Sequence, residues 1–230
     1  MSAYAGPADW WTDSTNEGRM HVLTKGIVQS NLLVHLDAGV TSSYSGTGTT
    51  WFDLSGNGNN AQIFGSPPHS SSDIGFFTMG AVDEYMEATL PETTLSTFSY
   101  EAWVNATVLD YYQTILDFAN DDFYFGTLYS QLITFDPNFD TGVNINANQW
   151  YGLHLTHTDG GPFRFYVNGI LVYTSTNNST TKTNTILSIG GNSAGELWNG
   201  KISRVALYNK SLAATEIQQS FNALRGRFGI

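Results

Sequence analysis

The sequence FRFYVNGILVY, residues 163–173, contains two apolar segments on either side of Asn168-Gly169. Val, Ile, Tyr and Phe favour β-strands, and Asn-Gly is the pair that most strongly favours a two-residue type I′ turn. This stretch therefore predicts a β-hairpin, with strands at 163–167 and 170–173.

Alternation of apolar and polar residues predicts further strands on both sides of this hairpin. The alternation is clearest at residues 32–36 and 98–104. Other segments that fit strands are 153–158, 186–189 and 201–208. One helix is predicted after Ser211, a good N-cap residue, and it is expected to end before Gly226. Many antiparallel strands with one short C-terminal helix predict an all-β fold, an antiparallel β-sandwich or jelly roll.

The composition agrees with such a fold and excludes several classes of protein. Of 230 residues, 14% are aromatic and only 13% are charged, and the net charge is −11. A disordered acidic chain would lack these aromatic residues. Nine Lys and Arg do not supply the basic face that nucleic-acid binding needs. The absence of Cys excludes thiolate metal sites and Cys nucleophiles.

The first 30 residues differ from the rest, and we expect them to form an extended N-terminal arm ahead of one domain at 31–230. They show no regular period, yet they include Trp10 and Trp11, which predict contact with the domain or with a neighbouring subunit. Acidic residues and the lack of an apolar run argue against a signal peptide. No apolar stretch reaches the ~18 residues of a membrane helix.

Several motifs occur in the order expected of one family. They are LLVHLD at 32–37, WFDLSGNGNN at 51–60, YVNG at 166–169, IGG at 189–191, NGKI at 199–202 and LYNKSL at 207–212 followed by Glu216-Ile217. With these motifs the chain resembles laminin-G-like jelly-roll domains of the concanavalin A-like superfamily. The segments SGTGTTW at 45–51 and FNALRGRFG at 221–229 are similar to the form found in tailed-phage virion proteins.

The resemblance implies a non-enzymatic structural protein of a bacteriophage virion, assembled in the host cytoplasm. On this interpretation the protein is a capsid decoration or cement protein. Its jelly roll and arm would bind capsid proteins or sister subunits, and it would form a homo-oligomer. The alternative is a carbohydrate-binding adhesin or a tail or neck fibre module that recognises host surface glycans. Neither interpretation involves nucleic acid or a membrane.

No catalytic residue is predicted. Glucanases of the superfamily carry a Glu-x-Asp-x-x-Glu strand, which places carboxylates on one face, and no such run occurs here. Residues 191–195 match Gly-x-Ser-x-Gly, but neither a following helix nor a later His is present to complete a hydrolase site. We interpret this segment as a Gly-rich hairpin.

Two groups of residues are candidate ligand sites. The first is a Gly-rich loop that contains the side-chain oxygens of Asp53, Ser55, Asn57 and Asn59. This pattern predicts either a bound calcium ion, which would be a cofactor, or an Asx-turn loop without metal.

The second group is aromatic. Trp198, Tyr111 and Tyr112 are candidates for stacking on a sugar ring or for a subunit interface. The nearby Asp110, Gln113, Asn120 and Asp121 could bond sugar hydroxyls. Core packing is the alternative for each ring, and Phe123 and Tyr124 belong to the same aromatic stretch.

Overall fold

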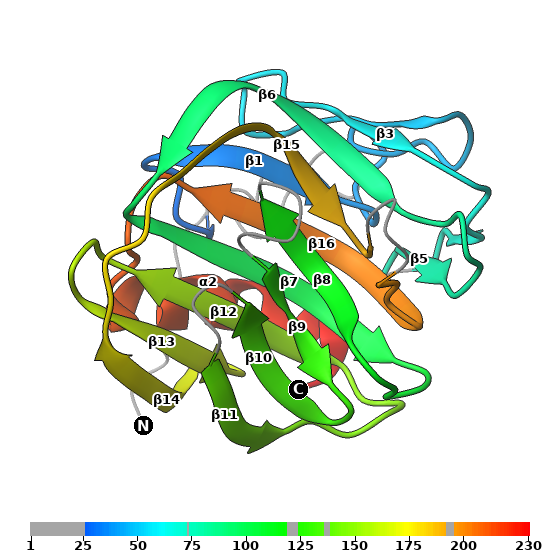
Figure 1. The fold of residues 1–230 in the computed structure, drawn as a ribbon. Coiled ribbons are helices and arrows are strands. Elements are labelled where there is room, and N and C mark those ends of the chain that lie inside the picture. Colours follow the sequence, from blue (N-terminus) through cyan, green and yellow to red (C-terminus); the bar gives the residue numbers. More distant parts are fainter. Residues whose placement is uncertain (1–25, 73, 119–123, 136–138, 192–195) are drawn as a thin grey trace, which may run out of the picture.

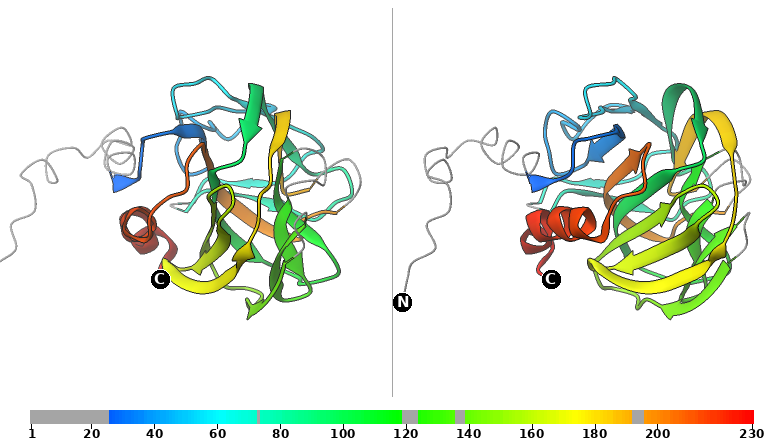
Figure 2. Two further views of the ribbon diagram at one scale, coloured as in Figure 1. Left: turned by 60° about the vertical axis from the view of Figure 1, so that its left-hand side comes forward. Right: turned by 90° about the vertical axis from the view of Figure 1, so that its left-hand side faces the viewer.

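The computed structural model describes residues 26–72, 74–118, 124–135, 139–191 and 196–230. In these ranges two antiparallel sheets pack face to face, and one helix covers the outer surface of one sheet (Figures 1 and 2). The predicted all-β sandwich with one C-terminal helix is confirmed. None of the helices described has the length and apolar character that crossing a membrane requires.

The sheet next to the helix is called here the helix-side sheet. Its order is β14 (Ile170–Asn177), β13 (Pro162–Val167), β12 (Tyr151–His157), β7 (Phe98–Ala106), β16 (Gly200–Tyr208), β5 (Phe76–Met79) and β4 (His69–Ser70). Strand β1 (Leu32–Asp37) also pairs with β16, from Leu32 opposite Tyr208 to Asp37 opposite Arg204.

The second sheet is called the opposite sheet. Its order is β11 (Phe139–Asn144), β10 (Gln131–Phe135), β9 (Tyr124–Leu128), β8 (Gln113–Phe118), β15 (Lys182–Ile189), β6 (Met86–Leu95), β3 (Ala61–Ile63) and β2 (Thr50–Trp51). The main core lies between the two sheets and includes the rings of Trp51, Phe77, Phe98 and Phe165.

The predicted hairpin is present as β13 and β14. Asn168 and Gly169 have φ values of 51° and 76°, and a type I′ turn requires positive φ at both positions. Beyond the turn, β14 continues to Asn177, so this strand is longer than the apolar pattern alone predicted.

Strand β7 is buried on both faces because the helix covers the outer side of its sheet. Phe98 and Tyr100 point into the core between the sheets. Trp103 points the other way, toward helix α2 (Ala214–Phe228), where it stacks on Phe221 at 5.8 Å and on Phe228 at 4.2 Å between ring centres. The aromatic cluster attaches the helix to the sheet.

Both predicted ends of the helix are wrong. Ser211 lies in a connection tied to β7, because Ser99 Oγ accepts a hydrogen bond from Leu212 N and donates one to the Lys210 carbonyl. The helix therefore begins later, with Ala213 as its N-cap residue.

The helix also continues past Gly226 to Phe228, and Gly229 ends it with a φ of 72°. Two contacts hold this last turn: Phe228 stacks on Trp103, and Arg227 forms an ion pair with Asp37 at 2.8 Å. The local effect of Gly226 is too small to end a helix that tertiary contacts extend.

A buried charged cluster lies beneath the helix. Arg204 on β16 and Glu101 on β7 form an ion pair in which neither side chain is exposed to solvent. Arg204 Nε also donates to His35 Nε2 at 3.1 Å. Burial opposes ionisation of the neighbouring Asp37, but Arg227 outweighs this effect and the pKa of the Asp37 carboxyl is lowered. The cluster thus joins three strands to the helix through charges.

Residues 26–30, the described end of the predicted arm, pack against the domain. Val28 is buried, its N–H donates to Ser220 Oγ on the helix, and its carbonyl accepts from the Tyr208 hydroxyl. Residues 1–25 lie outside the described ranges, so contact of Trp10 and Trp11 with a neighbour stays a prediction.

Candidate functional site

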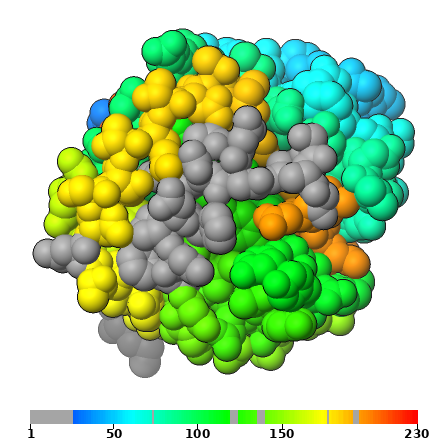
Figure 3. All heavy atoms as spheres, viewed as in Figure 1, coloured from blue at the N-terminus to red at the C-terminus, as the bar shows by residue number. Residues whose placement is uncertain are grey.

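A surface depression of about 270 Å³ lies at one end of the sandwich. Three connections meet there: the one after β5, the loop between β7 and β8, and the segment leading into β16. Its lining residues are Gly80, Asp110, Tyr111, Tyr112, Gln113, Leu197, Trp198 and Asn199. Figure 3 shows the orange segment that leads into β16 close to the green segment of β8, on the same face of the molecule.

Backbone hydrogen bonds hold these connections together. The Asn199 carbonyl accepts from the N–H groups of Thr107 and Val108, at 2.8 and 3.2 Å. The Glu196 carbonyl accepts from Thr114 N at 3.2 Å. The walls of the depression therefore rest on the ends of regular strands, which limits their movement.

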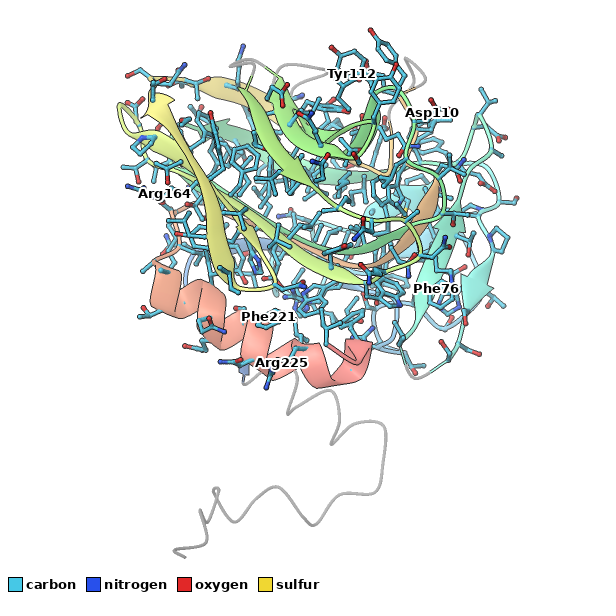
Figure 4. The ribbon with its side chains drawn as sticks, turned by 90° about the horizontal axis from the view of Figure 1, so that it is seen from below. Phe76, Asp110, Tyr112, Arg164, Phe221 and Arg225 are labelled. Carbon is cyan, nitrogen blue, oxygen red and sulfur yellow. The ribbon has the colours of Figure 1, made fainter. Side chains whose placement is uncertain are left out.

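Tyrosine rings form one side of the depression. Tyr111 is 62% exposed, and its ring lies 4.5 Å from that of Tyr112 and 5.9 Å from that of Tyr129, in edge-to-face geometry. Tyr129 is 57% exposed and donates its N–H to the Asp110 carbonyl at 2.9 Å. Figure 4 shows Tyr112 and Asp110 on the side of the molecule opposite helix α2. An exposed group of rings of this kind suits the apolar face of a flat ligand.

Two of these tyrosines have an uncommon backbone conformation. Tyr112 has a φ of 31° and Tyr129 a φ of 53°, whereas the other described non-glycine residues with positive φ are all Asn. Tyr129 is the first residue of the two-residue connection between β9 and β10, a position where Gly or Asn is favoured. Bulky residues in this region are strained, and such strain is concentrated at functional sites.

Gln113 contributes a polar group to the depression. Its side chain is only 3% exposed, and its Oε1 atom has no hydrogen-bond partner among the described residues. A buried acceptor without a partner costs stability.

Trp198 is one of the residues that line the depression, but its side chain is fully buried in the main core between the sheets. Its Nε1 faces the Lys201 carbonyl at 3.4 Å. A buried ring offers no face to a sugar, which corrects the expectation of stacking at Trp198. Tyr124 is likewise buried, and Asn120, Asp121 and Phe123 lie outside the described residues.

Sequence reasoning thus located Asp110, Tyr111, Tyr112 and Gln113, which the structure brings together, but it missed Tyr129. Tyr129 meets Tyr111 only because β8 and β9 pair as neighbours. Residues 128–131 contain no Gly, Asn, Asp or Pro, so no turn signal in the sequence identified Tyr129.

The second predicted site, the loop at 53–59, is held by its own hydrogen bonds. Asp53 Oδ1 accepts from the N–H groups of His35 and Ser55, and Oδ2 accepts from Ser55 Oγ and Asn59 N. Asn57 and Asn59 direct their amide nitrogens to the Leu33 carbonyl. These are the bonds that the Asx-turn alternative predicts. The calcium alternative stays a prediction, and no group of three or more His, Asp or Glu suited to a metal occurs in the described ranges.

The Gly-x-Ser-x-Gly segment is described only at Gly191, because residues 192–195 lie outside the described ranges.

Comparisons with solved structures find domains with a similar fold. A structure of botulinum neurotoxin type C, which depends on interaction with two ganglioside molecules to enter cells, is 14% identical, with a TM-score of 0.64. The binding domain of botulinum neurotoxin DC in complex with SialylT is 16% identical, with a TM-score of 0.67. In both cases the match covers 86% of this chain and 52% of the other, so this chain spans about half of their length.

A third structure matches over nearly its whole length. It is domain 4 of AbnA, a GH43 extracellular arabinanase from Geobacillus stearothermophilus, in complex with arabinotriose. It is 18% identical, with a TM-score of 0.65, and the match covers 83% of this chain and 98% of that domain. At these identities the likeness shows the fold.

No curated protein matches the chain. A laminin G family model, described as the concanavalin A-like lectin/glucanases superfamily, matches residues 79–218, more than half of the chain. The resemblance seen in the motifs is confirmed at this level, whereas the phage virion context stays a prediction. The chain belongs to the concanavalin A-like lectin/glucanases superfamily.

Proposed function

We propose that this chain is a non-catalytic carbohydrate-binding domain that holds one sugar residue in the depression beside Tyr111 and Tyr112. This is the function that sequence analysis offered as the alternative to capsid decoration. The observation that carries it is the exposed tyrosine group with strained backbone, next to the buried and unpartnered amide oxygen of Gln113.

The size of the site supports a small ligand. About 270 Å³ is just below the ~300 Å³ at which pockets for drug-sized ligands begin. One pyranose or furanose ring fits such a space, and the rest of a glycan would lie outside it, over Tyr111 and Tyr129. Tyr111 supplies the apolar face, while Gln113 and Asp110 accept hydrogen bonds from hydroxyl groups.

The structural relatives support the same class of ligand. Cell entry of one depends on interaction with gangliosides, the second is a binding domain in complex with SialylT, and the third is a domain in complex with arabinotriose. The proposal for this chain takes from these relatives the class of ligand, carbohydrate, and not an individual sugar.

A glycan array followed by titration calorimetry tests the proposal. Tyr111→Ala should weaken binding of any glycan detected by at least about tenfold, because stacking of a ring on an aromatic side chain is lost. Phe52→Ala is the matched control, because Phe52 is an exposed aromatic residue that does not line the depression. Equal binding by wild type and Tyr111→Ala would place any glycan site elsewhere.

The comparisons give capsid decoration less support than carbohydrate binding, and the capsid-decoration prediction keeps its own test. Deletion of residues 1–25, which keeps the packed residues 26–30, should abolish assembly into particles if Trp10 and Trp11 bind capsid or sister subunits. Normal assembly of the truncated protein would contradict the arm hypothesis.

A further inference from the structure

The depression has an acidic lining. Of its eight lining residues, Asp110 is the one with an ionisable charge near neutral pH, and none is Lys, Arg or His. Asp110 is exposed, and its Oδ1 accepts a hydrogen bond from Tyr111 N at 2.7 Å, which holds the carboxylate beside the tyrosines. A ligand in the depression therefore meets a fixed negative charge.

Arg204, Arg227 and Lys210 form ion pairs away from the depression. These pairs are Arg204 with Glu101, Arg227 with Asp37, and Lys210 with Glu216. The first two lie beneath helix α2, and the third lies at the start of that helix. They are not available to a ligand at the depression.

The other four cations in the described ranges lie elsewhere. Lys201 places its Nζ 4.9 Å from the centre of the Phe76 ring. Figure 4 shows Phe76, Arg164 and Arg225 away from Asp110 and Tyr112. Lys182 begins β15, whereas the depression follows the other end of that strand. The described part of the chain thus presents no positive side chain to a ligand there.

Recognition of an anionic sugar ordinarily uses Arg or Lys, which pair with its carboxylate or sulfate. Here the ligand's charge would instead approach Asp110, in a protein whose net charge is −11. Two like charges a few ångströms apart repel, and burial of an unpaired anion adds a desolvation cost.

From this charge distribution we infer that the depression accepts uncharged sugar residues and rejects sialylated, uronic and sulfated ones. This inference rests on the proposed function and specifies its class of ligand. Asp110 acts as the charge filter, and Tyr111 and Gln113 supply the attraction common to all sugars.

The test compares matched glycans on the full-length protein. An array presents neutral oligosaccharides beside their sialylated or sulfated forms, for example lactose beside 3′-sialyllactose, and calorimetry measures the pairs that bind. We expect acidic members to bind at least about tenfold more weakly at low salt. The difference should narrow at 0.5 M NaCl, because salt screens exposed charges.

Variants of Asp110 identify the cause. Asp110→Asn should reduce the difference between neutral and acidic members, and Asp110→Lys should reverse it. Asp159→Asn is the control, because Asp159 is an exposed carboxylate in another connection and its substitution changes the net charge equally. Both positions are exposed, so the variants are expected to fold.

The outcomes separate the two proposals. Acidic glycans that bind as well as their neutral partners, with both lost in Tyr111→Ala, would overturn the charge filter and leave the sugar site in place. An equal effect of Asp110→Asn and Asp159→Asn would also overturn the filter. Absence of binding to every glycan, or binding unaffected by Tyr111→Ala, would overturn the proposed function and the filter with it.

Discussion

Replacing Arg204 by Met removes the positive charge at the centre of the buried cluster beneath helix α2. Neither Arg204 nor Glu101 is exposed, so the substitution leaves the Glu101 carboxylate buried without its cation. Its described hydrogen-bond donor would then be Trp103 Nε1, at 3.0 Å. Removal of one partner from a buried ion pair costs about 3–5 kcal/mol.

That cost is a large part of the ~5–15 kcal/mol by which domains are stable. We therefore expect Arg204→Met to lower the free energy of unfolding by about 3–5 kcal/mol, measured by urea denaturation with Trp fluorescence. Adding Glu101→Gln removes the unpaired charge and should recover about 2 kcal/mol of the loss. Arg225→Met, on the exposed side of the helix, should change stability by less than about 0.5 kcal/mol.

Comparison of Arg204→Met with the double variant shows whether the unpaired Glu101 carboxylate causes the loss of stability, even if the single variant fails to fold. A single variant within about 1 kcal/mol of wild type would refute the reasoning that this pair is buried and indispensable. A double variant no more stable than Arg204→Met would show that the loss comes from packing and not from the unpaired charge.

Three further predictions concern pH and backbone conformation. Burial and the nearby Arg204 lower the pKa of His35 to about 3, whereas an unfolded chain takes up this proton near pH 6.5, so stability should fall as the pH drops from about 6.5 toward 3. The urea midpoint at several pH values measures this, and His35→Asn should flatten the dependence; an unchanged slope would assign it to other groups. Gly169→Ala should cost about 1–2 kcal/mol in thermal unfolding, because φ is +76° and the new Cβ would lie 3.0 Å from the Phe221 ring. Gly48→Ala, with φ +98° and open space, should cost less, and equal losses would mean that the contact with the helix is unimportant. Tyr129→Gly should be more stable than Tyr129→Ala by about 1 kcal/mol, since only Gly adopts positive φ without strain, and equal stability would show that this backbone is unstrained.

Local patterns in the sequence predicted much of the sandwich. The alternation at 98–104 and the Asn168-Gly169 turn depend on side-chain direction and backbone sterics within a few residues, so they could be recognised without tertiary information. Helical spacing in the sequence also predicts one face with Ala213, Ile217, Phe221 and Leu224; the last three are buried, whereas Ala213 is the exposed N-cap residue. The ends of the helix were predicted wrongly, because Ser99 and Trp103 decide them from a distant strand.

The candidate site likewise contains residues that the local sequence indicated and residues that only the tertiary structure brings there. Asp110, Tyr111, Tyr112 and Gln113 are contiguous, so their composition alone suggested a polar and aromatic surface. Contact with Tyr129, and with the segment at Leu197–Asn199, comes from strand pairing between residues far apart in the sequence. Trp198 looked equally suited to a sugar, but only its position between the sheets showed that the ring is buried.

By itself, the sequence determined the class of fold, the hairpin at 163–173 and the family, because these depend on short-range periodicity and on motifs in order. The tertiary structure decided which aromatic rings remain exposed, where Glu101 finds its cation, and which charges face the depression. Those properties depend on how two sheets and a helix pack. Packing brings together residues that are far apart in the sequence, and no local sequence pattern indicates such contacts. Tyr111, exposed beside Asp110, and Trp198, buried beneath them, differ for that reason alone.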